Sequence, residues 1–273
     1  MTIKPISVLL AAAALASCTT TNRVKLTGCD HVSGWSDQIR AMADTAYPYA
    51  QLAVNAYDDH RDDFVMGAEW RALERHPNNA HGMAYDIWER QSTAGGREVV
   101  LAFRGTEFAT IPDWRDGNFG TKQNADGVAV FDQARLKYPA ARYTVVGHSL
   151  GGGIATQISL SRPSVSSYIF NSSPRFKAPA YPESNVRVSV AEAGEVLKAV
   201  RILGREATQD YYSLNCSGGI AITQHFSKPL ATCLTRIASW DDPAAMTSLE
   251  RNNLAKPFPA SHPGRADCRK WHL

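Results

Sequence analysis

The hydrophobic and polar positions of the first half of the chain predict a helical region followed by a hairpin. Small and apolar residues recur near helical spacing over residues 36–57, and Pro48 within this stretch predicts a break into two helices. Residues 83–88 alternate in the manner of a strand. After a Gly-Gly pair, residues 98–103 form a short apolar run that is typical of a strand buried on both faces. We therefore expect a hairpin that leads into the interior of a sheet.

Strands and helices alternate through the second half of the chain. Runs rich in Val, Ile, Tyr or Phe predict strands at residues 142–146, 166–170 and 186–190. Helical spacing predicts helices around residues 128–137 and 153–160, around residues 230–237 and from Asp242 to about residue 254. This order is typical of the α/β class, which has a mostly parallel sheet covered by helices on both faces and ligand chemistry at the carboxyl ends of the strands. We expect one such domain over residues 35–273.

The first residues have the pattern of an export signal. Lys4 precedes an apolar run over residues 6–16 that is too short to span a bilayer of about 30 Å. The run ends in Leu-Ala-Ser before Cys18, which resembles the lipobox of bacterial lipoproteins, where cleavage precedes a cysteine that becomes lipidated. We expect a signal peptide over residues 1–17 and a tether over residues 18–34. An uncleaved anchor helix or a conventional signal peptide is the alternative.

The resemblance to lipoproteins also implies a location. A multiply acylated Cys18 would hold the protein on a membrane without any spanning helix. The next residue is Thr19 rather than Asp, which in lipoproteins favours sorting to the outer membrane. We therefore expect a lipid-anchored protein of the bacterial cell envelope, at the outer membrane.

The composition mainly excludes classes of partner and classes of protein. The chain carries 29 Lys and Arg residues against 26 Asp and Glu residues, so its formal net charge of +3 gives no reason to expect nucleic acid as a partner. With 44% apolar and 20% charged residues, it lies in the ordinary globular range and away from disordered or disulfide-dense classes.

Four cysteines follow the lipobox, and in an exported protein we expect them to be oxidised. Our preferred pairing is Cys216–Cys233 and Cys29–Cys268, with free buried cysteines as the alternative. A bond between the first pair would bracket His225 on both sides. The spacings differ from those of a zinc site, and we expect neither a metal nor a cofactor.

The predicted strand at residues 142–146 runs into Gly-His-Ser149-Leu-Gly-Gly and then into a predicted helix. This strand, turn and helix form the context that a G-x-S-x-G nucleophile elbow requires. The flanking glycines leave room for a sharp turn, which lifts the Ser149 hydroxyl above the sheet. The N–H of Leu150, at the start of the helix, then points toward a developing oxyanion. A phosphate-binding glycine loop is the alternative, but the chain lacks the motifs of such loops.

Three segments resemble the class 3 lipases, the fungal-lipase-like branch of the α/β-hydrolases. They are residues 99–106 with the later Asp-Trp pair, the elbow, and residues 173–175. The resemblance covers about residues 80–240. It implies an α/β-hydrolase-like fold with the backbone N–H of Thr106 as the second oxyanion-hole donor. Residues 108–119, which carry aromatic side chains among polar ones, are either a lid or acyl-chain wall or a plain surface loop.

The resemblance also implies which carboxylate is the acid. A nucleophilic serine needs a histidine as base and a carboxylate that orients the imidazole, and in this fold the chain order is serine, acid, histidine. The family places an Asp after the strand at residues 186–190, whereas this chain has glutamates there. Glu195 aligns best because it is followed by Val196, as in the family pattern. Glu192 and Asp210 are the alternatives.

Of the eight histidines, His225, His262 and His272 follow the elbow serine in the chain. His225 precedes a predicted amphipathic helix, as the histidine loop of the family does, and it is our predicted base. His262 is the alternative. We expect His148, within the elbow, to be a packing residue because adjacent side chains of such a turn point away from one another.

These predictions combine into a serine hydrolase of carboxylic esters, a lipase or phospholipase with Ser149, His225 and Glu195 as its triad and the N–H groups of Thr106 and Leu150 as its oxyanion hole. Its partners would be an ester or phospholipid substrate and, through the lipid anchor, a membrane. An acyltransferase with the same triad, or a non-catalytic envelope lipoprotein that keeps the fold, is the alternative. A buried serine oxygen, or a distant imidazole, would contradict the hydrolase prediction.

Overall fold

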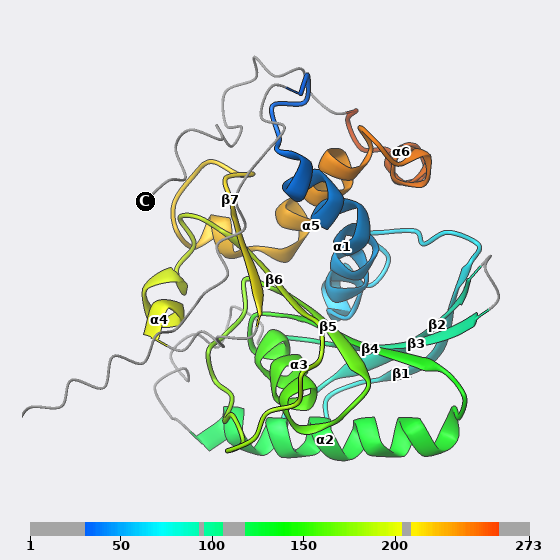
Figure 1. Ribbon diagram of the computed structural model, residues 1–273, viewed down its shortest axis with the longest axis vertical. Helices are drawn as coiled ribbons and strands as arrows, with labels where there is room; N and C mark the ends of the chain where they lie inside the picture. Colours follow the sequence, from blue (N-terminus) through cyan, green and yellow to red (C-terminus); the bar gives the residue numbers. More distant parts are fainter. Residues whose placement is uncertain (1–30, 93–95, 106–117, 204–208, 257–273) are drawn as a thin grey trace, which may run out of the picture.

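The protein is built around one seven-stranded sheet whose strands follow the order of the sequence (Figure 1). The computed structural model describes residues 31–92, 96–105, 118–203 and 209–256. The first two strand pairs are antiparallel and the remaining pairs are parallel, so the expected single α/β domain with a mostly parallel sheet is confirmed. The strands are β1 (Trp70–His76), β2 (Tyr85–Ser92), β3 (Gly96–Phe103), β4 (Arg142–His148), β5 (Val165–Phe170), β6 (Arg187–Glu192) and β7 (Asp210–Leu214).

Helices cover both faces of the sheet, as expected. α1 (Asp37–Asn55) and α5 (Ser227–Ala238) lie on one face, whereas α2 (Asn118–Lys137) and α3 (Leu150–Ser161) lie on the other (Figure 1). The strands β3, β4 and β5 advance in one direction, so right-handed crossovers place α2 and α3 on the same face. The remaining helical elements are η1 (Asp58–His60), α4 (Lys198–Leu203), η3 (Thr223–His225) and α6 (Pro243–Arg251).

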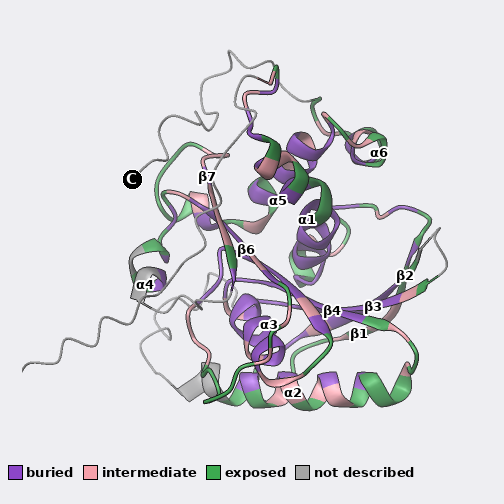
Figure 2. Cartoon of the chain, viewed as in Figure 1, coloured by how far each residue is buried: buried purple, intermediate pink, exposed green. Residues whose placement is uncertain are grey.

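Neighbouring positions of β3 belong to two separate apolar cores, which explains the uninterrupted apolar run in this strand. Val100 and Ala102 face the core that α1 and α5 share with the sheet, whereas Val99 and Leu101 face the core on the side of α2 and α3. All four side chains are fully buried, and the central strands are buried along most of their length (Figure 2). The predicted hairpin into the sheet interior is confirmed, because β2 pairs with β3 from Tyr85 to Ser92.

The expected break at Pro48 is wrong, because residues Asp37–Asn55 form the single helix α1. A proline inside a helix removes a backbone hydrogen bond and costs about 3 kcal/mol. Here Pro48 and its neighbours Tyr47 and Tyr49 are all buried, and α1 packs along α5 and the central strands. The burial of most of this helix in the core, and of all its residues from Ala46 to Asn55, outweighs the local cost of the proline.

Among the strands and α-helices of the described residues, β1, α4 and β7 have no counterpart in the prediction. Both strands lie at the edges of the sheet, where most of their side chains are exposed or half-buried. Edge strands of this kind lack the apolar pattern that reveals a central strand. α6 is shorter than expected and ends at Arg251.

No helix within the described ranges is long and apolar enough to cross a membrane. Cys18, Thr19 and the whole of the expected signal peptide lie outside the described residues. The lipid anchor at Cys18 and the boundaries after residues 17 and 34 therefore stay predictions.

Candidate active site

Ser149 occupies the turn between β4 and α3 and has the strained backbone that a nucleophile elbow requires. Its φ of 54° and ψ of −122° are unusual for a residue with a side chain. The N–H of Ser149 donates to the carbonyl oxygen of Phe170 at 3.1 Å, and its own carbonyl oxygen accepts from the N–H groups of Gly152 at 3.1 Å and Ser173 at 2.9 Å. These bonds tie the turn to the end of β5 and to the first turn of α3.

Two glycines make the turn sterically possible. A Cβ atom on Gly147 would lie 2.3 Å from the carbonyl carbon of Gly151, and a Cβ atom on Gly151 would lie 2.2 Å from the carbonyl oxygen of Phe103. Gly105 also approaches the elbow, because a Cβ atom there would lie 2.9 Å from Cβ of Ser149. The loop after β3 therefore lies beside the serine. Thr106, the next residue, is outside the described residues.

The structure brings together the three residues predicted as the triad. Oγ of Ser149 lies 3.0 Å from Nε2 of His225, and Nδ1 of His225 lies 2.7 Å from Oε2 of Glu195. A carboxylate only accepts hydrogen bonds, so Nδ1 carries the imidazole proton and Nε2 is free to accept from the serine hydroxyl. The residues come from the ends of β4 and η3 and from the segment between β6 and α4. This geometry permits transfer of the hydroxyl proton to the imidazole.

Glu195 is ionised despite its burial. Burial by itself would raise the pKa of this carboxyl, but the hydrogen bond from His225 and the positive charge of Arg201 outweigh it and lower the pKa below its usual value. Besides His225 and Arg201, the N–H of Leu197 also donates to the carboxylate, to Oε2 at 2.8 Å. The carboxylate is thus charged at neutral pH and faces the imidazole.

The backbone of His225 is held from the sheet side. Its carbonyl oxygen accepts from Nε2 of His148 at 2.7 Å and from Nδ2 of Asn171 at 3.2 Å. The other ring nitrogen of His148, Nδ1, lies 2.8 Å from the hydroxyl of Tyr57 and accepts its proton. Burial holds the pKa of His148 well below its usual value, so this imidazole is neutral. His148 occupies the packing position that the sequence predicted for it.

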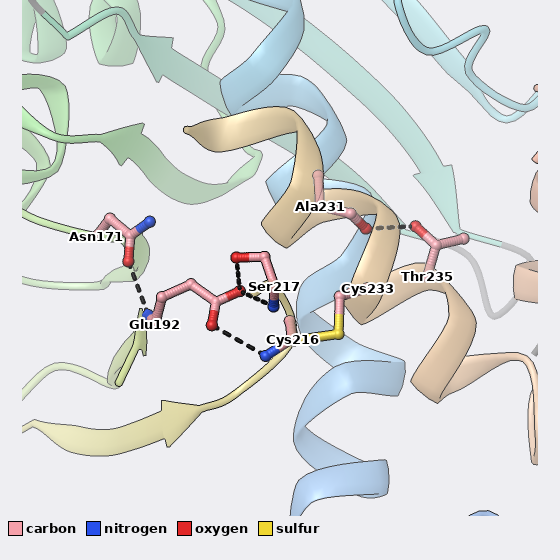
Figure 3. The surroundings of a disulfide bond; sticks show 7 residues. All are labelled: Asn171, Glu192, Cys216, Ser217, Ala231, Cys233 and Thr235. Atoms are coloured by element: carbon pink, nitrogen blue, oxygen red, sulfur yellow. Dashed lines mark hydrogen bonds between the residues drawn. A yellow bond between two sulfur atoms is a disulfide. The ribbon is translucent and has the colours of Figure 1, made fainter. Parts of the chain in front are cut away.

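The alternative acids lie elsewhere. Glu192 accepts from the N–H groups of Cys216 at 2.9 Å and Ser217 at 3.1 Å, and burial raises its pKa to about 7 (Figure 3). It holds the turn after β7. Asp210 is the first residue of β7, at the end of the sheet opposite the elbow. The alternative base His262 is outside the described residues.

One predicted disulfide is present. Cys216 and Cys233 are bonded, with their Cα atoms 5.8 Å apart, and they join the segment after β7 to α5 (Figure 3). His225 lies between them in the chain, so the bond closes the loop that carries the imidazole. The second predicted pair, Cys29–Cys268, lies outside the described residues.

The exposure of the serine differs from the expectation. Ser149 is 2% exposed and His225 is 0% exposed, so the hydroxyl is not presented openly to solvent. The requirement of an accessible oxygen was too strict, because a nucleophile needs to be reachable during turnover and not in every conformation. Residues 108–117 of the expected lid or surface loop are outside the described residues.

A cavity of about 740 Å³ lies beside α3. Ser173, whose N–H donates to the elbow, begins the segment that forms one wall of this cavity. The lining is mostly apolar and includes two cationic side chains. It consists of Asn124, Ala125, Val128, Gln157, Arg175, Phe176, Lys177, Ala178 and Pro179. Among the described residues no three His, Cys, Asp or Glu side chains are grouped as the ligands of one metal ion.

Sequence reasoning did not find three residues that contact the site, namely Tyr57, Asn171 and Arg201. Asn171 follows β5 directly and has a φ of 41°, and a polar residue at the carboxyl end of a central strand is a signal that was available. Tyr57 lies between α1 and η1 and Arg201 belongs to α4, and neither position carries a comparable signal in the sequence.

The chain is similar to one protein family and to several solved structures. Residues 41–201 match the profile of a phospholipase-like family, described as the Tle-like phospholipase domain. Among curated protein sequences, none matches the chain.

Three similar solved structures are fungal lipases. The lipase–propeptide complex of Rhizomucor miehei has 17% identity and a TM-score of 0.42, with 62% of this chain and 66% of that chain covered, so the chain spans slightly under two thirds of its length. The lipase of Rhizopus microsporus var. chinensis has 14% identity and a TM-score of 0.39, with 61% and 71% covered. Lipase II of Rhizopus niveus has 15% identity and a TM-score of 0.41, with 61% and 77% covered.

These structural similarities concern the fold alone. The match to the family profile shows the family as well, because it covers more than half of the chain, from within α1 through the elbow to α4. The chain therefore belongs to the family of the Tle-like phospholipase domain, which is described as phospholipase-like.

Proposed function

We propose that this protein cleaves carboxylic esters of phospholipids or acylglycerols, with Ser149 as nucleophile, His225 as base and Glu195 as the acid that orients the base. The observation that carries the proposal is the continuous pair of hydrogen bonds from the serine hydroxyl through the imidazole to the carboxylate, at 3.0 Å and 2.7 Å. An ionised carboxylate on Nδ1 fixes the tautomer in which Nε2 accepts the serine proton.

The proposed reaction has two steps. Oγ of Ser149 attacks the ester carbonyl carbon while Nε2 of His225 takes the hydroxyl proton. The N–H groups of Leu150 and Thr106 stabilise the oxyanion, and the proton passes from the imidazole to the departing alcohol as the ester C–O bond breaks. Leu150 suits this role because it is the first residue of α3, where N–H groups have no partner inside the helix. A water molecule, activated by the same imidazole, then releases the fatty acid.

Two surface features support a lipid substrate. Large apolar side chains are exposed on both segments that flank the triad, at Val196 on the acid side and at Ile220, Ile222 and Phe226 on the base side. The N–H of Val196 donates to the carbonyl oxygen of Ala221 at 3.1 Å, so these two segments are neighbours. An apolar rim around a reactive group suits a water-insoluble substrate better than a soluble ester.

The cavity beside α3 has the matching chemistry. No triad residue lines this cavity, but its apolar wall suits acyl chains, and the cationic side chains of Arg175 and Lys177 suit the phosphate of a phospholipid headgroup. We also propose that Cys18 anchors the protein to the bacterial outer membrane, which would place this site next to its substrate. The support for this anchor is the lipobox-like sequence alone.

The test combines active-site labelling with product analysis. A fluorophosphonate probe should label the wild-type protein and should not label Ser149→Ala. Ser159→Ala is the matched control, since Ser159 is equally buried on α3 but donates to the carbonyl oxygen of Thr156. The probe is offered with and without phospholipid vesicles because Ser149 is buried in the resting conformation.

The products separate the proposal from its rivals. Free fatty acid released from phospholipid vesicles supports a hydrolase, whereas acyl groups found on a second alcohol identify an acyltransferase. If neither the vesicle-bound nor the free protein labels at Ser149, the proposed nucleophile is wrong and the fold serves a non-catalytic role.

A further inference from the structure

A buried arginine lies behind the proposed triad carboxylate. Arg201 belongs to α4, is 3% exposed and donates from Nη2 to Oε1 of Glu195. Its Nε donates to the carbonyl oxygen of Ser172 at 2.9 Å, and its Nη1 lies 3.4 Å from the hydroxyl of Tyr211 on β7. One guanidinium therefore joins the end of β5, the strand β7 and the carboxylate.

The two oxygens of Glu195 have separate partners. Oε2 accepts from Nδ1 of His225 at 2.7 Å and from the N–H of Leu197 at 2.8 Å, whereas Oε1 accepts from Arg201. Rotation of the carboxylate about its terminal bond would break bonds on both oxygens. The guanidinium therefore helps to fix the oxygen that faces the imidazole.

We propose that Arg201 is a positioning residue for this site, which keeps Glu195 ionised and turned toward His225. The inference rests on the proposed function, because this positioning affects a reaction only if His225 is the base. Arg201 touches the carboxylate and not the reacting atoms, so it acts through Glu195.

The physical need for a cation follows from burial. Removing a carboxylate from water favours its neutral form, and a neutral Glu195 would no longer stabilise positive charge on the imidazole. Against burial, the hydrogen bond from His225 and the charge of Arg201 lower the pKa of Glu195. An opposite charge within about 4–6 Å has this effect in general. Among the described residues, the other titratable groups near the pair are His148 on β4, Glu192 on β6 and Tyr211 on β7.

The planar guanidinium suits this position better than an ammonium group would. It directs Nε, Nη1 and Nη2 toward three acceptors at fixed angles, whereas a lysine presents one compact charge on a flexible chain. Loss of the positive charge should therefore change the ionisation of Glu195. Replacement of the guanidinium by an ammonium group, which keeps the charge, should change the orientation of the Glu195 carboxylate.

The same charge has an opposing effect on the base. When His225 takes the serine proton, a nearby cation disfavours the imidazolium that forms. The contribution of Arg201 to the rate must therefore come from the acid, and its loss should lower kcat and shift the pH dependence while leaving KM nearly unchanged.

The experiment compares Arg201→Gln and Arg201→Lys with wild type in the full chain. Glu195 is followed by 13C NMR of its labelled carboxyl carbon from pH 3 to 8, and kcat is measured over the same range with phospholipid vesicles. Arg187→Gln is the matched control, since Arg187 is 1% exposed and donates to the carbonyl oxygen of Ser159 from the opposite end of β6.

In Arg201→Gln we expect the carboxyl titration and the acidic limb of kcat to move to higher pH by about one unit or more. In Arg201→Lys both should stay within about half a unit of wild type, with kcat lowered about tenfold by the lost geometry. Arg187→Gln should lower stability but leave the carboxyl titration of Glu195 and the acidic limb of kcat at the wild-type pH.

Two results would overturn the proposal. One is a folded Arg201→Gln protein whose Glu195 titrates as in wild type. The other, decisive if the glutamine variant does not fold, is an Arg201→Lys protein with unchanged kcat. The NMR titration does not depend on turnover, so a protein that neither labels at Ser149 nor releases fatty acid would contradict the proposed function while the titration still decides the role of Arg201.

Discussion

The two halves of the candidate site are held by different physical means. On the nucleophile side, Ser149 is placed by backbone packing, in a turn where Gly147 and Gly151 leave no space for a side chain. On the acid–base side, Glu195 and His225 are placed by hydrogen bonds, charge and a disulfide. The nucleophile side therefore depends on the space at two glycines, which an added side chain would fill. The acid–base side depends on hydrogen bonds, a charge and a disulfide, which substitutions can remove separately.

Because of this difference, substitutions on the two sides of the site should have different effects. A change at the elbow displaces backbone and should affect folding and activity together. A change among the partners of Glu195 or His225 should alter the rate or its pH dependence at a smaller cost in stability.

Replacing the triad acid should have the largest effect on the rate. Glu195→Gln places a neutral amide against Nδ1 of His225, which removes the charge that stabilises the imidazolium, so kcat should fall by roughly 10³–10⁴-fold. Glu192→Gln is the matched control, because its carboxylate binds the N–H groups of Cys216 and Ser217. It should keep kcat within about tenfold of wild type. Equal losses in the two variants would reject Glu195 as the acid.

On the nucleophile side, Gly151→Ala should destabilise the whole protein. The new Cβ would lie 2.2 Å from the carbonyl oxygen of Phe103, which is backbone and cannot swing away. We expect the free energy of unfolding to fall by about 3 kcal/mol or more, measured by chemical denaturation. Gly96→Ala is the control, since a Cβ there meets nothing within 4 Å and should change stability by less than about 0.5 kcal/mol. A stable and active Gly151→Ala protein would contradict the steric account of the elbow.

On the acid–base side, removing the disulfide should loosen the base. The double variant Cys216→Ala/Cys233→Ala loses a loop closure over a sequence separation of 17, which should lower the free energy of unfolding by about 3 kcal/mol. We expect slower fluorophosphonate labelling of Ser149, because His225 lies within the opened loop. Dithiothreitol should slow labelling of the wild type and leave the double variant unchanged. Labelling that is equally fast in all of these samples would show that the disulfide does not position the imidazole.

The sequence predicted the nucleophile side well because steric constraints leave a local trace. The elbow must have glycines around Ser149, and β3 is apolar from Val99 to Phe103, where it is buried on both faces, so both are visible within a few residues. The base was predicted from chain order, since His225 follows the serine and precedes a helix. The edge strands β1 and β7 were missed because half-exposed side chains leave no pattern.

The partners on the acid–base side leave no such trace. In the sequence only the following Val196 favours Glu195 over Glu192. In the structure their contacts separate them, because Arg201 and His225 meet Glu195 and Cys216 meets Glu192. The burial of Ser149 was equally hidden, because it depends on how the whole chain closes over the elbow. The continuous α1 through Pro48 belongs to the same class of tertiary effects.

The smallest predicted effect tests whether the two halves are coupled. The hydroxyl of Tyr57 donates to Nδ1 of His148, whose Nε2 donates to the backbone oxygen of His225, so the elbow and the base loop share one hydrogen-bond chain. Tyr57→Phe leaves a buried ring nitrogen without this donor and should cost about 1–2 kcal/mol in stability and lower kcat severalfold. Tyr143→Phe, which loses a bond to the carbonyl oxygen of Ala134 at the far end of β4, should cost stability alone. If the two variants show the same kcat as wild type in a vesicle assay, backbone packing alone positions His225, and the two halves of the site are independent.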